Sequence, residues 1–305
     1  MTGQARPLFG IIIAARNADR FILDTLRSLT FLPNDLFRVI VVNDGSTDGT
    51  ADVVETFKDA HPEIDLTLLD GPARGVSAAR NKGLSQTNTP YVIFLDADDL
   101  LAADALDSFR AALTDVASVA ALGRVLRITE DGNPMPSPDN RDLLPESDQL
   151  YALIRKNFIV NGGALAIRTE VAKAVEGYDE TLKYGEDWEF WCRVLTQGKL
   201  TALQNDYALK YRQISTGANV TAASKPFARD ILCLKRVRKN PVIRQQVGWR
   251  LLVALRMRRV DIFWSGVRTT YQYGQKRAAL LLSAVGLLVY PDSIMRPRLA
   301  LRLLK

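Results

Sequence analysis

YVIFLDADD, residues 91–99, is the stretch that decides the fold of this 305-residue chain. Five apolar or aromatic residues run into the three carboxylates of Asp96, Asp98 and Asp99 within four positions. A short, uninterrupted apolar run is typical of a buried strand in a parallel sheet. The acids that follow predict that the carboxyl end of this strand opens into a polar cleft.

Carboxylates this close repel one another unless a cation lies between them. Oxygen ligands favour Mg²⁺ or Mn²⁺, and Mg²⁺ is commonly held by one or two carboxylates together with substrate phosphates. One interpretation is therefore a divalent-metal site for a nucleotide diphosphate. The alternative is a strand followed by a helix over residues 100–113, with Asp98 or Asp99 as its N-cap.

The chain before this stretch alternates between apolar runs and amphipathic helical patterns. Strands are expected at 8–15, 38–42, 64–69 and 91–95, and helices at 19–29, 50–60 and 75–85. Because strand and helix alternate through short loops, we predict an α/β fold with a mostly parallel sheet flanked by helices. Ligands of such sheets bind at the carboxyl ends of the strands, where Asn17, Asp44 and Asp96 would converge.

The later chain carries weaker strand signals and then becomes helical. A long strand or a strand pair is expected at 116–128, a helix at 147–156, a short strand at 163–167 and a helix at 184–197. From Lys225 onward the pattern is helical, so we place a boundary near residues 215–225.

Charge is divided unevenly along the chain, whose net charge is +6. Residues 225–305 hold 18 Lys and Arg against three Asp, whereas residues 1–224 hold 22 basic and 31 acidic residues. This asymmetry favours an anionic partner for the basic part. Basic helices interleaved with Trp and Tyr suit an anionic membrane surface. The alternative is an appendage packed on the first part, and the acidic first part argues against nucleic acid.

The two cysteines, Cys192 and Cys233, are too few and too far apart for a disulfide framework or a zinc site, which fits a reducing compartment. The apolar run at 9–15 is too short for a signal peptide and ends at Arg16. The longest uncharged apolar run, 278–290, falls short of the ~18 residues of a spanning helix. These features predict a cytoplasmic protein, peripheral on the inner face of the membrane if the basic part binds lipid.

Asp44 and Arg80 are candidate nucleotide ligands. Asp44 lies in VVNDGSTD and offers a carboxylate to a base or ribose; the alternative is an Asx turn, with Asp48 or Thr50 capping the next helix. Arg80 lies in GVSAARNKG, where small residues let a helix approach the sheet and Arg80 reach a phosphate or base. The alternative for Arg80 is a solvated surface position.

The segment GEDWEFW, residues 185–191, is a candidate catalytic element. The chain contains one histidine, His61, in a polar loop, so a general base at this cleft would be a carboxylate. An aromatic wall would desolvate Asp187 and raise its basicity. The alternative is that acids at a helix N-terminus merely complement the helix dipole. Trp188 and Trp191 would stack on sugar faces or pack in the core.

The order of these segments resembles glycosyltransferase family 2. The resemblance rests on IIIAARN (11–17), VVNDGSTD (41–48), VSAARN (76–81), FLDADD (94–99), GYDE (177–180) and GED (185–187). It implies a GT-A fold and metal-dependent transfer of a sugar from a nucleotide diphosphate to an acceptor hydroxyl, with inversion. Patterns typical of dinucleotide oxidoreductases, P-loop enzymes, zinc proteases and serine hydrolases are absent from the sequence.

The resemblance also implies residue roles. Asp44 would bind the base, Asp96 the ribose and Asp98 the metal, Mn²⁺ or Mg²⁺. Arg80 would help hold the nucleotide, and the segment containing Ala14, Arg16 and Asn17 would line the same site. Asp187 would be the base that deprotonates the acceptor.

Three further residues are implied on the acceptor side. Glu186 would orient donor or acceptor, and Gly163 and Trp188 would contact acceptor or sugar. The donor and an acceptor glycan or lipid-linked glycan are the expected partners.

Three segments depart from the family pattern. Ala14 and Arg16 stand where Pro and Tyr are common, and Ala73-Arg74-Gly75 replaces a frequent Asn-Gly-Gly. Tyr211-Arg-Gln-Ile214 replaces Tyr-Arg-x-His, so the metal would rest on Asp98 and the phosphates.

The sequence thus predicts a catalytic domain over 1–220, with a nucleotide-binding half at about 1–115 and an acceptor half at about 116–220. A helical basic region follows at 221–305. The expected function is an inverting glycosyltransferase of surface polysaccharide or glycolipid synthesis. Two alternatives remain: a nucleotidyltransferase, which would prefer a Gly-rich loop that residues 14–17 lack, and a non-catalytic module that binds nucleotide or membrane.

Overall fold

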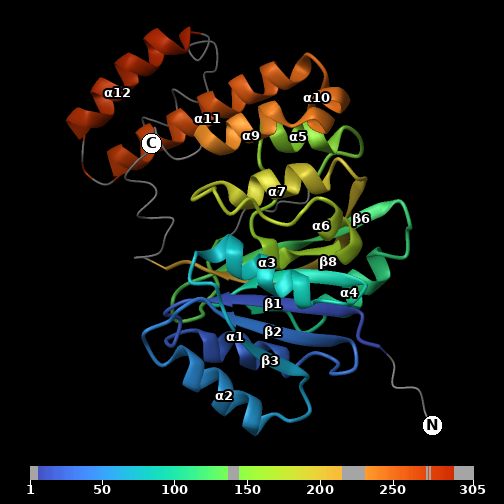
Figure 1. Ribbon diagram of the computed structural model, residues 1–305. Coiled ribbons are helices and arrows are strands. Elements are labelled where there is room, and N and C mark those ends of the chain that lie inside the picture. Colours follow the sequence, from blue (N-terminus) through green and yellow to red (C-terminus); the bar gives the residue numbers. More distant parts are fainter. Residues whose placement is uncertain (1–5, 137–143, 215–230, 273, 275, 292–305) are drawn as a thin grey trace. The chain divides into compact units, whose positions relative to one another are not determined.

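The computed structural model describes residues 6–136, 144–214, 231–272, 274 and 276–291 (Figure 1). By its internal contacts the chain divides into two compact units. Unit 1 comprises Met1–Leu150 and Asn157–Gln213, and unit 2 comprises Tyr151–Lys156 and Ile214–Lys305.

Unit 1 is built on one sheet with strand order β3-β2-β1-β4-β7-β6-β8-β5. Its parallel half consists of β1 (Phe9–Ala15), β2 (Phe37–Asn43), β3 (Leu66–Asp70) and β4 (Tyr91–Asp96). The helices between these strands are α1 (Ile22–Leu29), α2 (Thr50–Ala60) and α3 (Val76–Gln86). The predicted α/β fold with a mostly parallel sheet is confirmed.

The apolar residues of the central strands explain why this half is buried. Ile11, Ile12 and Ile13 of β1 and Val92 and Ile93 of β4 are fully buried. Helix α3 packs closely on the sheet because Gly83 has no side chain. A Cβ at this position would lie 2.4 Å from Ile12 Cγ2.

The second half of the sheet is mixed. It contains β5 (Leu100–Leu101), β6 (Ser118–Ile128), β7 (Leu165–Arg168) and β8 (Lys199–Arg212). β7 runs antiparallel to both β4 and β6, whereas β8 is parallel to β6 with register shifts. The helices of this half are α4 (Ala105–Ala112), α6 (Thr169–Ala174) and α7 (Glu186–Val194), with a 3₁₀ turn at Gly162–Ala164.

Two sequence expectations in this half are corrected. The helix considered for residues 100–113 is wrong in its first part, since β5 occupies Leu100–Leu101 and α4 begins at Ala105 after Asp104. Asp98 and Asp99 therefore do not cap it. The long strand β8 and the short helix α6 were not predicted.

Most described residues of unit 2 are helical. They form α9 (Ile231–Lys239), α10 (Pro241–Val247), α11 (Arg250–Gln272) and α12 (Lys276–Val289), and α5 (Gln149–Arg155) overlaps this unit. α11 and α12 share an apolar cluster that includes Phe263, Trp264 and Tyr290, and a Cβ on Gly286 would lie 2.3 Å from Phe263. Among the described helices, none combines the length and apolarity needed to cross a membrane.

Candidate active site

The carboxyl ends of β1, β2 and β4 lie at one edge of the sheet and form the floor of the site. Ala14 pairs with Asp96, and Ala15 pairs with Asn43, so the residues after these strands start side by side. The Asp44 amide donates to the Ala15 carbonyl at 2.8 Å. The sequence motifs at these three strand ends are therefore neighbours.

Asp44 is 2% exposed and ties β2 to the start of α3. Its Oδ2 accepts from the Gly75 amide at 2.7 Å, while its buried Oδ1 accepts no hydrogen bond from a described group. The Asx-type contact proposed for Asp44 is made by Asn43 instead, whose Oδ1 accepts from the Ser46 amide at 3.1 Å. Asp44 thus keeps one carboxylate oxygen for another donor.

The end of β1 is fastened to the loop after β2 by Asn17. Its φ is +50°, and its Oδ1 accepts from the Thr47 amide at 2.8 Å. Ala14 is half-buried and Arg16 is exposed. The predicted nucleotide-side residues of this segment therefore lie at the same edge as Asp44.

Arg80 is the electrostatic centre of the site. Its side chain is 6% exposed, and its two terminal nitrogens donate to Asp96 Oδ1 and Asp187 Oδ1, both at 2.7 Å. The guanidinium also lies 5.1 Å from the centre of the Tyr178 ring. The alternative of a solvated surface arginine is wrong. The guanidinium instead joins α3 to β4 and α7.

Asp187 lies in the first turn of α7, after Gly185 in a left-handed conformation (φ +72°). Burial raises its pKa to about 7; Arg80 opposes this shift, and the negative charges of Glu186 and Asp96 add to it. Its side chain is still 32% exposed, so a substrate can reach it. A carboxylate with a pKa near neutrality is suited to accept a proton at physiological pH.

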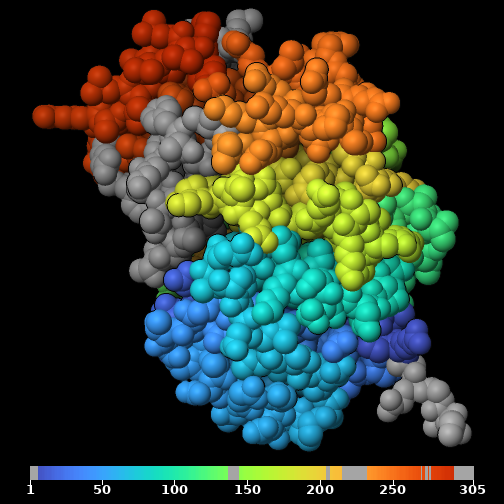
Figure 2. Space-filling view, viewed as in Figure 1, coloured from blue at the N-terminus to red at the C-terminus, as the bar shows by residue number. Residues whose placement is uncertain are grey.

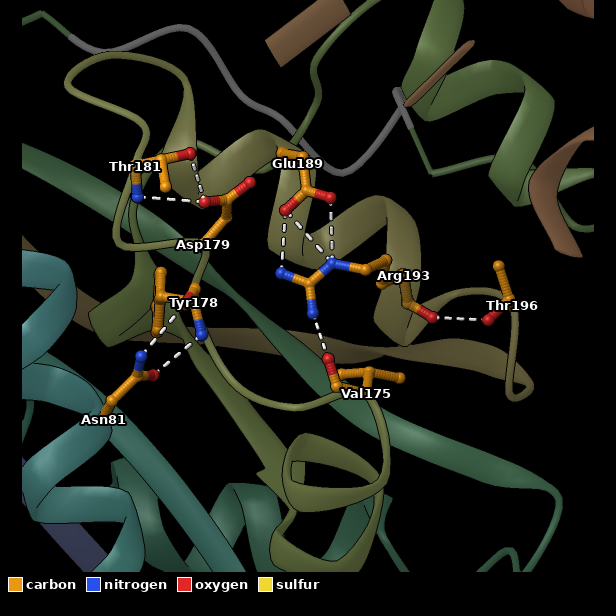
Figure 3. Close-up of polar contacts among 8 residues, drawn as sticks. All are labelled: Asn81, Val175, Tyr178, Asp179, Thr181, Glu189, Arg193 and Thr196. Atoms are coloured by element: carbon orange, nitrogen blue, oxygen red, sulfur yellow. Dashed lines mark hydrogen bonds and ion pairs between the residues drawn. The ribbon is translucent and has the colours of Figure 1, made fainter. Parts of the chain in front are cut away.

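The loop that leads into α7 is anchored by the neighbour of Arg80 (Figure 3). Asn81 donates to the Tyr178 carbonyl at 2.9 Å and accepts from the Tyr178 amide at 2.8 Å. Gly177 has φ +63°, and a Cβ there would lie 2.4 Å from Asn81 Oδ1. Glu189 and Arg193 form an ion pair along α7, and Arg193 also donates to the Val175 carbonyl.

The acid triplet after β4 contains one carboxylate that differs from the other two. Oxygens of Asp96, Asp98 and Asp99 lie within 4.8 Å of one another. Asp99 accepts from Asn161 and from the Arg212 amide, both at 2.8 Å, and Asp96 accepts from Arg80 and Asn161. Asp98 forms no ion pair with any described basic side chain.

The pKa of Asp98 is raised to about 6, first by burial and then by the charge of Asp96. The charge of Arg212 opposes this rise in pKa. A carboxylate held beside other acids is the donor type that a hard divalent cation prefers. The triplet therefore fits such a cation at Asp98, with Asp96 and Asp99 already engaged by protein donors.

Residues 10–175 match the family described as Glycosyl transferase family 2, which is more than half of the chain. The chain belongs to this family. It is 27% identical over 222 residues to a putative teichuronic acid biosynthesis glycosyltransferase, TuaG, of Bacillus subtilis, covering 72% of this chain and 85% of that protein. It is 31% identical to the succinoglycan biosynthesis protein ExoU of Rhizobium meliloti, covering 65% of this chain and 60% of that protein.

Two solved structures share the fold of this glycosyltransferase. The S. aureus TarS fragment 1–349 in complex with UDP-GlcNAc has a TM-score of 0.62 at 19% identity, covering 86% of this chain and 81% of that one. The mannosyltransferase PcManGT of Pyrobaculum calidifontis, in complex with GDP-Man and Mn²⁺, has the same TM-score and identity, covering 98% and 85%. The predicted GT-A fold is confirmed.

The residues predicted on the acceptor side of this glycosyltransferase differ in their burial. Glu186 is half-buried beside Asp187. Gly163 is buried, its amide donates to Asn161 Oδ1 at 2.7 Å, and a Cβ there would lie 2.8 Å from Leu209. Trp188 is 3% exposed, which leaves almost no ring face open to a sugar. The acceptor roles of Gly163 and Trp188 stay predictions, and Gly163 has a clear structural role.

Sequence reasoning missed two residues that organise the acids. Asn161 bridges Asp96 and Asp99, and Arg212 joins the Asp98 carbonyl at 2.9 Å to Asp24 at 3.2 Å. Arg212 is 4% exposed and also donates to the Glu130 carbonyl. Of these two residues, only Arg212 lies in a motif that the sequence analysis considered, Tyr211-Arg-Gln-Ile214. That motif was considered because it lacks the histidine of the family pattern, and no role was predicted for Arg212.

Proposed function

We propose that Asp187 is the general base of a metal-dependent, inverting transfer from a nucleotide-diphosphate sugar. The observation that carries this proposal is the bridge of Arg80 between Asp96 and Asp187 at 2.7 Å on each side. This bridge places the candidate base next to the acids assigned to the donor.

The reaction follows from this arrangement. Asp187 accepts the proton of the acceptor hydroxyl while that oxygen attacks the anomeric carbon. The bond from this carbon to the diphosphate oxygen breaks on the opposite face, so a single displacement inverts the centre. Arg80 fixes the Asp187 carboxylate and keeps part of its charge compensated until the proton arrives.

Asp98, together with the donor phosphates, would hold Mn²⁺ or Mg²⁺. When bound, the metal stabilises the negative charge of the departing diphosphate. Ile214 stands where the family pattern often has histidine, so Asp98 is the protein ligand that the described residues offer most directly. The Mn²⁺ in the PcManGT complex supports a divalent cation in this fold.

The nucleotide would lie at the edge formed by Ala14, Arg16, Asn17, Asp44 and Asp96. The buried Asp44 Oδ1 would accept an N–H from the base, because a buried acceptor without a partner is costly. Asp96 would contact the ribose. The UDP-GlcNAc and GDP-Man complexes of the two structural neighbours support a nucleoside diphosphate sugar as donor.

The acceptor is proposed to be a surface polysaccharide or a lipid-linked glycan. The names of the teichuronic acid and succinoglycan proteins support this class. The proposed location is the cytoplasmic face of the cell membrane, because the basic C-terminal region suits an anionic surface.

A thermal-shift screen of nucleotide sugars, with and without Mn²⁺, tests the proposal. The cognate donor should raise the melting temperature, since ligand binding to the native state stabilises it by RT ln(1 + [L]/Kd). Release of nucleoside diphosphate with the identified donor should follow. Release of pyrophosphate from a nucleoside triphosphate would instead indicate a nucleotidyltransferase, and binding without turnover or transfer would indicate a non-catalytic module.

A further inference from the structure

Unit 2 concentrates positive charge. Its described residues include 14 Lys and Arg and a single acid, Asp261. Positive charge that acids do not balance attracts anions and discourages association with a second copy of the chain. We therefore expect an anionic partner for unit 2.

Two pockets in unit 2 gather these cations around apolar side chains. The first, of about 360 Å³, is lined by Lys235 and Arg238 of α9 and by Arg256 and Arg259 of α11, together with leucines and Tyr290. Each pair of cations is spaced three residues apart, which places its members on one face of their helix. Among the described residues, no carboxylate lines this pocket.

The second pocket, of about 540 Å³, adjoins the first. The two share Arg238 and Leu252, and the second adds Lys239, Arg244 and Trp249. Both pockets are lined by cations together with apolar side chains, and their residues on α9, α10 and α11 belong to the region coloured orange in Figure 2. A ligand that fits them has to carry anionic and apolar parts together.

Large apolar side chains stand exposed beside these cations. Trp249 is 78% exposed and Leu252 is 62% exposed. Exposed tryptophan beside basic residues is typical of a protein surface that lies at a membrane interface.

Helix α12 extends the apolar surface. Ala279 and Gly286 pack toward α11, while Leu280, Leu281 and Leu288 are 69%, 70% and 83% exposed. Its 14 residues are about 21 Å long, which is shorter than the roughly 30 Å hydrocarbon core of a bilayer. Such a helix lies in the interface rather than across the membrane.

We propose that unit 2 binds the phosphate headgroups of anionic lipids. The headgroup phosphates occupy the pockets around Arg238, and Trp249 and the exposed leucines of α12 lie at the boundary between headgroups and acyl chains. This inference gives the proposed peripheral location a site, and lipid binding is measured independently of sugar transfer.

The pocket is tested with the full chain and vesicles of phosphatidylcholine, alone or with 30% phosphatidylglycerol. The chain should float with the anionic vesicles and not with the neutral ones. The variant Lys235→Gln/Arg238→Gln/Arg259→Gln should bind the anionic vesicles at least about tenfold more weakly, because each basic residue at the surface contributes to binding.

The matched control is Arg155→Gln/Lys156→Gln/Arg268→Gln, which removes the same charge from unit 2 outside both pockets. It should retain most of the binding. An equal loss in the two triple variants would show that overall charge, not the pockets, drives adsorption, and would overturn the proposal.

Trp249 gives a local readout. The chain has four tryptophans, and Trp188, Trp191 and Trp264 are only 3%, 3% and 5% exposed. Phosphatidylglycerol with brominated acyl chains should quench the fluorescence of Trp249, and the variant Trp249→Phe should abolish this quenching.

Further measurements also test the proposed lipid binding. Binding to neutral vesicles with equal strength, or a stable dimer in light scattering that does not bind vesicles, would overturn the proposal. Unchanged melting temperatures and donor-induced shifts in the variants would show that unit 1 is intact. A chain that binds lipid but no nucleotide sugar would refute the proposed function and leave this inference standing.

Discussion

Single residues at the site are defined by how their charges are paired. Arg80 compensates two carboxylates that lie 16 and 107 positions away in the sequence. Asp98, by contrast, stands in the acid triplet without an ion pair among the described residues. Asp187 is thus the proposed proton acceptor, and Asp98 is the proposed ligand of a cation.

Replacement of Asp187 by Asn should lower kcat by about 10³-fold, because the base is lost while the shape is kept. In the wild-type chain kcat/KM should rise with pH until about pH 7 and then level off, since the raised pKa of Asp187 keeps it protonated below that value. A steady-state assay of nucleoside diphosphate release across pH 5.5–8.5 measures both. Asp107→Asn, at an exposed position of α4, is the control that should change neither. Turnover retained in the Asp187 variant would remove Asp187 as the base.

Replacement of Arg80 should change the same pH profile of kcat/KM. Its positive charge lowers the pKa of Asp187, so Arg80→Gln should move the rising limb to higher pH as well as slow the reaction. The residual activity of this variant is followed with radiolabelled donor. A slower enzyme with an unmoved profile would mean that Asp187 is not the titrating group.

Asp98 should control metal affinity. Asp98→Asn is expected to weaken Mn²⁺ binding in the presence of nucleoside diphosphate by about tenfold or more, since it removes a charged oxygen ligand. In the wild-type chain the affinity should increase between pH 5 and 7, because the pKa of about 6 has to be passed before the carboxyl group can bind the cation. Free Mn²⁺ is measured by electron paramagnetic resonance, and equal affinities in both chains would contradict the assignment.

At the scale of elements, α3 and α7 form the site together although they are far apart in the sequence. Arg80 reaches Asp187 of α7, and the adjacent Asn81 holds the loop that precedes α7 through Tyr178. Gly177 allows this contact because it has both a positive φ and no Cβ to meet Asn81. The loop therefore fixes where α7 starts.

Gly177→Ala should destabilise the chain by about 3 kcal/mol through backbone strain and a steric clash. Gly132→Ala is a matched control: its φ is +84°, but nothing lies within 4 Å of the added Cβ, so strain of about 1 kcal/mol is expected. Denaturant unfolding measures both free energies. Equal costs for the two variants would show that the contact with Asn81 does not matter.

At the scale of the whole molecule, the two units differ in the sites that they contain. Unit 1 contains the candidate active site, and unit 2 contains the basic pockets. Each unit has one buried cysteine, Cys192 at 0% and Cys233 at 2% exposure, and neither forms a disulfide. Thiol labelling therefore reports the opening of each unit separately.

Donor binding should protect the two cysteines unequally. At a donor concentration of 100 Kd, labelling of Cys192 should slow by about 100-fold, because the native state gains about 2.7 kcal/mol. Labelling of Cys233 should change far less. Mass spectrometry of tryptic peptides assigns the rates, with Cys192→Ser and Cys233→Ser as references; equal protection would indicate that the units open as one.

The sequence by itself determined the parallel half of the sheet and the acids at its edge. Apolar runs such as residues 91–95 and the helical periodicity of residues 50–60 are local signals, and parallel strands put their carboxyl ends at one edge wherever the rest of the chain lies. For this reason residue patterns could place Asp44, Asp96 and Asp98 at one edge and make Asp187 a candidate base, and the family resemblance assigned a role to each.

The tertiary structure alone decided which charges meet. The bridge from Arg80 to Asp187, the Asn161 clamp on Asp96 and Asp99, and the burial of Trp188 depend on contacts across many tens of residues, which no local periodicity encodes. Strand β8 was missed for a related reason, because its register shifts against β6 blur the alternation expected of a strand. Local patterns specify the elements, but packing distances and dielectric surroundings set the pKa of a carboxylate, and these exist only in the folded chain.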